Sequence, residues 1–201
     1  MILTEIQADI IKELFNRGVG KAAVILSEML SSQIILSVPQ LVQGTSHDIS
    51  DGLTETEIMG IKQKFDGVYH GEAMLLYGHR SCLEFIGSLL GYQEIPGEFG
   101  YFERETLSEF GNIILSSCLC EFENALGCKL STSTPLVVSG QFPKDFLFAE
   151  NFSSQDLLSL NMNFSLSNTS FTGKISLVLN PNDLKDMALR LDAYLERILA
   201  A

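Results

Sequence analysis

Basic residues are scarce in this chain of 201 residues, which has 13 Lys and Arg against 25 Asp and Glu and a formal net charge of −12. Nucleic-acid binding needs a basic surface that replaces the counterions of the phosphates, so this function class is disfavoured. An acidic surface suits partners with exposed Lys or Arg, although it also simply keeps a protein in solution. The 46% of hydrophobic residues still predict a globular protein with a sizeable core.

Long apolar runs are also missing. None approaches the roughly 20 residues of a membrane-spanning helix, and the start, MILTEIQADI, lacks the basic segment and apolar core of a signal peptide. We therefore expect a cytoplasmic protein without membrane contact. The four cysteines form no CxxC pair and no metal-ligand spacing with the histidines, so we expect reduced, structural thiols at Cys82, Cys118, Cys120 and Cys128.

A conventional nucleophile beside a general base is likewise not evident. His47, His70 and His79 fall in or near expected loops and strands, and nothing links them to a Ser or Cys. The sequence contains no Gly-rich phosphate loop. These absences disfavour a stand-alone hydrolase of small phosphoesters, and they predict no metal and no cofactor bound by the chain itself.

What the chain does contain is an order of elements that occurs twice. Periodicity and turn residues predict a long helix, a proline-bearing strand, a hairpin and a closing helix in each half. In the first half they fall at 4–30, 32–42, 60–78 and 79–91, and in the second at 102–126, 128–140, 160–180 and 181–200. Thr4 followed by Gln7 predicts a capping box at the first helix.

The spacing of particular residues repeats as well. Four residues of the first half have counterparts 96 positions later: Asp9, Glu13, Asn16 and Pro39 correspond to Glu105, Glu109, Asn112 and Pro135. We therefore predict one domain over 1–201, made of two repeats at about 1–100 and 101–201 and related by a pseudo-two-fold axis. Because short hairpins join antiparallel strands, the expected fold class is α+β, in α/β layers, with a largely antiparallel sheet and the two long helices packed on it.

Each long helix is predicted to have one apolar and one polar side. The apolar positions of the first helix predict a buried side formed by Ile10, Ile11, Leu14, Val19, Ala22, Ile25, Leu26 and Met29. At 100° per residue, the opposite side carries a polar stripe made of Asp9, Glu13, Asn16 and Gly20. The second helix has the same stripe in Glu105, Glu109, Asn112 and Ser116. The small last residue would let a partner approach the helix backbone.

The chemistry available to such a stripe is positioning rather than covalent catalysis. A carboxylate can engage a cation, and an amide one turn away can orient a water molecule. Phosphoryl transfer requires little covalent chemistry from the protein, so a carboxylate and an amide that position the reactants are suited to it. A single ExxN on a helix is usually a solvated face, but two copies in register, each followed by a proline at the same distance, make coincidence a poor explanation.

This pattern resembles the CheC/CheX/FliY family of chemotaxis phosphatases, and its two signatures resemble the CheC-type members. The family signature is Asp or Ser, three residues, Glu, two residues, Asn, then 22 residues and Pro. The first copy has all four residues, and the second has Glu105 where the family usually has Asp or Ser. Arg17 follows the first Asn where an apolar residue is common. It either reaches toward Glu13 or a bound phosphate or, as we favour, is a solvated flank.

The resemblance implies a substrate and roles for the stripe. The substrate would be a phosphorylated CheY-like response regulator, whose aspartyl phosphate comes with the regulator's own divalent metal. Glu13 and Glu109 would pair with the regulator's active-site lysine, and Asn16 and Asn112 would hold the attacking water. Asp9, Gly20, Glu105 and Ser116 would contact the partner. The deamidase CheD is a possible second partner.

One rival function remains open at this point. The chain could be a noncatalytic binding module, similar to the middle domain of the flagellar switch protein, or a scaffold for CheD. Intact Glu and Asn residues on both helices favour the phosphatase, because docking alone does not need the amide.

Overall fold

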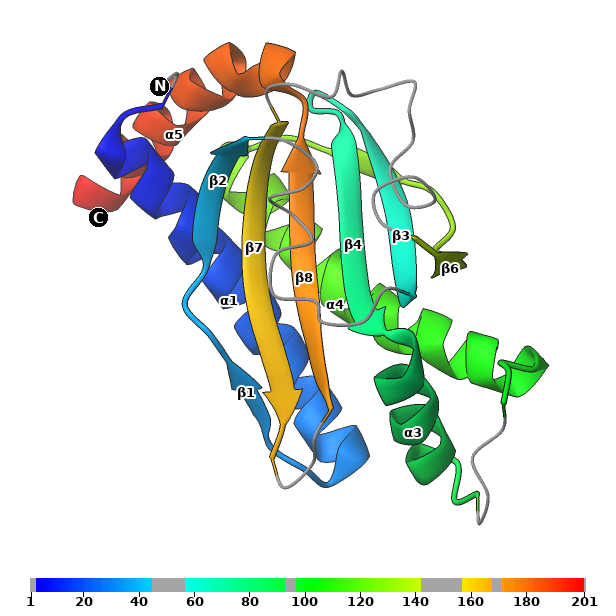
Figure 1. Cartoon of the computed structure of the whole chain (residues 1–201). Coiled ribbons are helices and arrows are strands. Elements are labelled where there is room, and N and C mark those ends of the chain that lie inside the picture. Colours follow the sequence, from blue (N-terminus) through cyan, green and yellow to red (C-terminus); the bar gives the residue numbers. More distant parts are fainter. Residues whose placement is uncertain (1–2, 45–56, 93–96, 142–156, 168–170, 201) are drawn as a thin grey trace.

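A computed structural model of the protein describes residues 3–44, 57–92, 97–141, 157–167 and 171–200. The helices are α1 (Glu5–Leu30), α3 (His79–Leu89), α4 (Tyr101–Leu126) and α5 (Leu184–Leu199), with the 3-10 turn η1 (Pro181–Asp183) before α5. The strands are β1 (Ile34–Leu36), β2 (Gln40–Gly44), β3 (Ile58–Gly67), β4 (Gly71–Gly78), β5 (Leu130–Thr132), β6 (Leu136–Gly140), β7 (Leu157–Leu166) and β8 (Thr172–Leu179). Figure 1 shows this arrangement.

All described strands belong to one open sheet in which every pairing is antiparallel. The order is β1-β7-β8-β4-β3-β5, with β2 also on β7 and β6 also on β3. The two predicted hairpins, β3–β4 and β7–β8, form the centre of the sheet and meet at β4 and β8. The short strands of each half pair with the hairpin of the other half, so neither half completes its part of the sheet alone. This architecture confirms the predicted α+β fold class.

Each predicted proline-bearing strand is in fact two short strands at an edge of the sheet. The segment 32–42 divides into β1 and β2 around Pro39, and the segment 128–140 divides into β5 and β6 around Pro135. Proline has no N–H to donate to a strand ladder, so the pairing breaks there and proline is tolerated at an edge. Pro39 therefore lies at an edge of the sheet, between β1 and β2.

Glycine and phenylalanine lie opposite each other in both central hairpins. Phe65 of β3 pairs in register with Gly71 of β4, and Phe164 of β7 pairs with Gly173 of β8. A Cβ on either glycine would come within 2.1 Å and 2.5 Å of the respective phenylalanine ring. Each ring therefore occupies the space that a side chain of its partner would need, which holds the two hairpins in the same local geometry.

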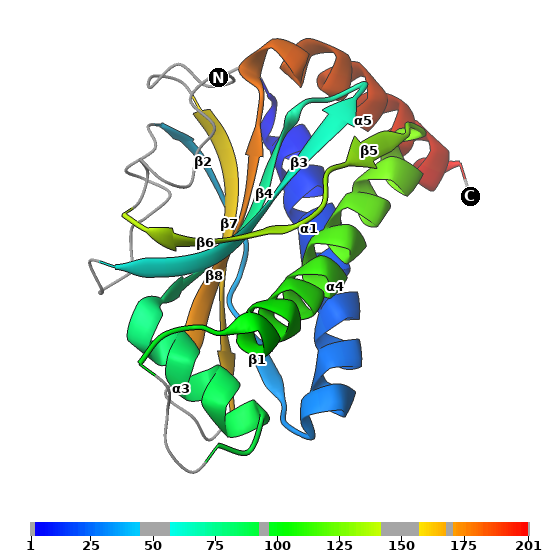
Figure 2. The same ribbon diagram turned by 90° about the vertical axis from the view of Figure 1, so that its right-hand side faces the viewer.

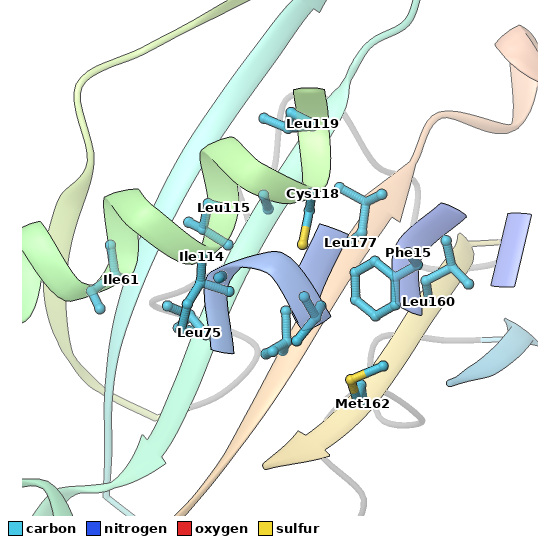
Figure 3. Close-up of a cluster of buried hydrophobic side chains, with 14 of the residues drawn as sticks. Phe15, Ile61, Leu75, Ile114, Leu115, Cys118, Leu119, Leu160, Met162 and Leu177 are labelled. Atoms are coloured by element: carbon cyan, nitrogen blue, oxygen red, sulfur yellow. The ribbon is translucent and has the colours of Figure 1, made fainter. Parts of the chain in front are cut away.

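The helices α1 and α4 cover one face of the sheet, as Figure 2 shows. Their apolar sides and the facing strands form the core: Phe15 from α1 and Leu115 from α4 lie over Leu75, Leu160 and Leu177 of the sheet (Figure 3). Both helices are 26 residues long and they begin 96 positions apart, as β1 and β5 and also β2 and β6 do. The division into repeats at about 1–100 and 101–201 stays a prediction.

Two residues of the predicted buried side of α1 are exposed instead. Ile25 is 47% exposed and Met29 is 61% exposed, whereas Ile11, Leu14 and others of the set are buried. The cause is tertiary, because α4 crosses α1 further up and lies away from its last turns (Figure 2). The start of the helix is as predicted: Thr4 Oγ1 accepts from the Gln7 amide, and Gln7 Oε1 accepts from the Thr4 amide.

Candidate functional site

The polar stripe of α1 faces away from the core. Asp9, Glu13 and Asn16 are exposed and Gly20 is half-buried, with open space where a Cβ would stand. The Lys12 ammonium contacts Asp9 Oδ1 at 2.6 Å, so the first carboxylate has a partner within the helix. Glu13 and Asn16 lie on adjacent turns and present their side chains to solvent.

The stripe of α4 has the same order of residue types as the stripe of α1, and it has one additional contact. Glu105, Glu109 and Ser116 are exposed, and Asn112 is half-buried. The Ser116 hydroxyl donates a hydrogen bond to Asn112 Oδ1 at 3.2 Å. This bond engages the amide oxygen of Asn112, and Gly20 cannot supply the equivalent contact to Asn16. The two stripes therefore share their order but differ at the last position.

The two helices come into close backbone contact at Gly18. A Cβ there would lie 2.6 Å from Cys118 Cα and 3.0 Å from the Ser117 carbonyl oxygen, so only glycine fits. The helices run in opposite directions across each other (Figure 2). Asn16 precedes the crossing on α1 and Asn112 precedes it on α4, so the two Glu–Asn pairs, Glu13 with Asn16 and Glu109 with Asn112, lie on opposite sides of it. The structure thus places the two pairs apart from each other, as two separate candidate sites on the outer surface of the helix layer.

A buried carboxylate beside the first site joins three helices. Glu121 on α4, whose side chain is 5% exposed, contacts the Arg17 guanidinium at 3.2 Å and also accepts from the Lys21 ammonium. Arg17 Nη1 donates to Tyr194 Oη of α5 at 3.3 Å. The alternative contact with a bound phosphate stays a prediction. The Arg17 side chain is 47% exposed, which agrees with the solvated flank favoured from the sequence, and it also contacts α4 and α5. It anchors α1 directly after Asn16.

We expect Glu121→Gln to lower the free energy of unfolding by about 1 to 2 kcal/mol, because the amide keeps the shape but not the charge that both cations share. Urea denaturation would measure the difference. The control is Asp9→Asn, which removes the exposed contact with Lys12 and should change stability by less than about 0.5 kcal/mol. Equal effects of the two substitutions would contradict the role given to Glu121.

Glu121 carries one signal in the sequence that periodicity alone does not interpret. It is an acidic residue on the apolar side of a helix, and charged residues are rarely buried without a partner. The partners come from α1, 100 and 104 positions away, so local sequence could not name them.

The histidines and cysteines form no part of the two stripes. His70 contacts Asp183 at the β3–β4 turn, and the His79 ring packs edge-on against Phe99, while His47 lies outside the described residues. Cys82, Cys118 and Cys128 are buried and Cys120 is exposed, and all four are free thiols. Burial raises the pKa of the Cys118 thiol, which keeps it protonated and unreactive.

Within the described ranges, no three His, Cys, Asp or Glu side chains come together in a way that could hold a metal ion. In the same ranges, the helices are too short or too polar to span a membrane. The chemistry that the stripes offer is therefore that of solvent-facing carboxylates and amides on two rigid helices.

Known proteins are similar to this chain in sequence and in structure. No family model matches the sequence. The candidate CheY-P phosphatase CheC1 of Halobacterium salinarum is 23% identical over 130 residues, which span 64% of this chain and 66% of that protein. The chain thus matches just under two thirds of the relative's length.

Solved structures match over more of the chain. Thermotoga maritima FliY has a TM-score of 0.75 at 18% identity, covering 96% of this chain and 100% of the other. The FliM middle domain from H. pylori has a TM-score of 0.68 at 8% identity, covering 94% and 99%. A chain of the CheX–CheY–BeF3–Mg2+ complex from Borrelia burgdorferi has a TM-score of 0.57 at 16% identity, covering 84% and 96%. The chain therefore has the fold of the CheC/CheX/FliY family of chemotaxis phosphatases.

Proposed function

We propose that the protein is a phosphatase that hydrolyses the aspartyl phosphate of a CheY-like response regulator in the cytoplasm. The observation that carries this proposal is the pair of Glu–Asn sites, which face solvent at equivalent positions of α1 and α4. The core does not need either pair, and folding does not need an exposed amide at Asn16. The CheX–CheY complex among the structural relatives supports a regulator as partner.

The proposed roles follow from the chemistry of the side chains. Glu13 and Glu109 attract the lysine beside the regulator's phosphorylated aspartate, which aligns the helix with the phosphoryl group. Asn16 and Asn112 then accept from and donate to the attacking water, holding it in line with the bond that breaks. The metal belongs to the regulator, so the chain contributes position and hydrogen bonds and needs no cofactor of its own.

The second candidate function is a noncatalytic binding module or scaffold, for a flagellar-switch-like assembly or for CheD. The likeness to the FliM middle domain favours this candidate. The two functions differ in what happens to the phosphoryl group, because a module binds the regulator without shortening the life of the phosphate.

The test is the decay of a phosphorylated regulator. The source organism's CheY-type protein would be phosphorylated with acetyl phosphate, freed of the donor and followed with a limiting amount of this protein. We expect decay to accelerate by about tenfold or more, with many regulator molecules turned over per chain. Binding of the regulator with unchanged decay would favour the module and overturn the phosphatase.

A further inference from the structure

Two aromatic side chains stand exposed where the second site helix begins. Tyr101 is 74% exposed and Phe102 is 72% exposed, the two highest values among the described aromatic residues. Their rings contact each other edge-to-face at 5.9 Å between centroids. Two exposed aromatic rings lower the solubility of a protein, and aromatic residues are enriched at protein–protein interfaces.

The backbone under this pair is fixed. Glu103, two residues into the helix from Tyr101, folds back over Gly100, where a Cβ would lie 2.7 Å from Glu103 Oε2. Tyr92 Oη donates to Glu103 Oε1 at 2.6 Å, and this bond with backbone amides of Gly100 and Glu103 lowers the pKa of the carboxyl. The carboxylate thus caps the start of α4 from the side opposite to the stripe. The backbone that carries the aromatic pair is consequently fixed before any partner arrives.

The pair continues the stripe of α4. Tyr101 and Phe102 precede Glu105 by four and three positions, and residues at these spacings lie on the same face one turn apart. This face therefore runs from the two rings through the two carboxylates to Asn112.

The equivalent face of α1 has no aromatic residue. The positions 96 residues earlier are Glu5 and Ile6, and Ile6 is 59% exposed. The two sites therefore differ at their outer ends, where a partner would first make contact, although their Glu–Asn pairs are alike.

We propose that Tyr101 and Phe102 form a docking contact for the regulator at the second site, one that the first site lacks. This inference rests on the proposed function. The surface that would contact the two rings is the part of the regulator beside the phosphorylated aspartate. An apolar patch there, or the aliphatic part of a Lys or Arg side chain, would pack against the rings. Glu105 and Glu109 on the same face complement such a basic surface, and cations pack favourably on aromatic faces.

The test isolates the second site with Asn16→Ala. In that background, Tyr101→Ser with Phe102→Ser should raise KM for the phosphorylated regulator by about 10- to 100-fold and leave kcat within about twofold. Affinity for the beryllofluoride-activated regulator should fall by the same factor. The matched control is Ile6→Ser in the same background, because Ile6 occupies the equivalent place on the first helix; it should leave both constants unchanged.

The outcomes separate the two proposals. Turnover by Asn16→Ala with an unchanged KM in the aromatic variant overturns the docking contact and leaves the phosphatase standing. Binding without turnover overturns the phosphatase, and the affinity measurement still decides the docking contact. A chain that binds no regulator overturns both. Because both rings are exposed, the melting temperature should not change, and if it falls, Phe102→Ser alone gives the same comparison.

Discussion

Gly18→Ala should lower the free energy of unfolding by about 2 kcal/mol, although alanine is the better helix former. The added Cβ would stand 2.6 Å from Cys118 Cα and 3.0 Å from the Ser117 carbonyl oxygen. Both neighbours are backbone atoms, which cannot rotate away, so α1 and α4 must separate along their whole contact. Urea unfolding would give the difference. The two polar stripes would shift as well, because the crossing sets their relative position.

Gly20→Ala is the matched control for this prediction. Gly20 lies two residues further along the same helix, and nothing lies within 4 Å of a Cβ built there. The substitution should stabilise the protein by about 0.5 to 1 kcal/mol through helix propensity alone. If both glycines respond in the same direction, the crossing at Gly18 is not the constraint described here. A loss of activity at the first site in Gly20→Ala would support the close approach of a partner expected at this position.

The second large effect is on catalysis. Asn16→Ala combined with Asn112→Ala should lower kcat for the phosphorylated regulator by about 100-fold, because the attacking water loses the amide that orients it. The affinity for the regulator should remain within a factor of about three, since Glu13 and Glu109 are still present. Single-turnover decay of the phosphoryl group and a separate binding measurement would give the two quantities.

A surface asparagine outside the stripes controls for the substitution itself. Asn124 is exposed on α4, and its amide contacts Cys120 Sγ within the helix at 3.4 Å. Asn124→Ala should leave kcat and affinity unchanged. If the double variant binds the regulator poorly and retains kcat, the asparagines serve docking rather than the chemical step.

The parts of the fold that depend on short-range chemistry could be predicted from the sequence. Thr4 and Gln7 mark the start of α1, and Gly127, at φ 62°, ends α4 as its position predicts. The hairpin predicted at 60–78 is formed by β3 and β4. Each of these features is decided within a few residues, so sequence carries the information.

Features that depend on distant residues could not be predicted. The pairing of β2 with β7 joins residues more than 100 positions apart, and the alternation of strand residues does not say which neighbour they meet. Ile25 and Met29 follow the apolar period of α1, and they are exposed only because of where α4 crosses. Gly18 and Glu121 have the same origin, since each acquires its importance from the opposite helix.

The candidate site stands between these two cases. Its residues could be chosen from the sequence because Glu13, Asn16 and their counterparts repeat on the polar side of two periodic helices. Glu13, Asn16 and Glu109 are exposed and Asn112 is half-buried, and their role as a site stays a prediction. The contacts that distinguish the two copies could not be foreseen, because the Ser116–Asn112 bond and the fixed backbone under the aromatic pair depend on side-chain geometry.

The central claim is that one site occurs twice and that each copy works on its own. Phosphate release from excess phosphorylated regulator should be measured for wild type, Asn16→Ala, Asn112→Ala and the double variant under one condition. The account predicts that each single variant keeps activity and that their rates add up to the wild-type rate, with the double variant near the background. A double variant as active as wild type, or a single variant as inactive as the double, would contradict it.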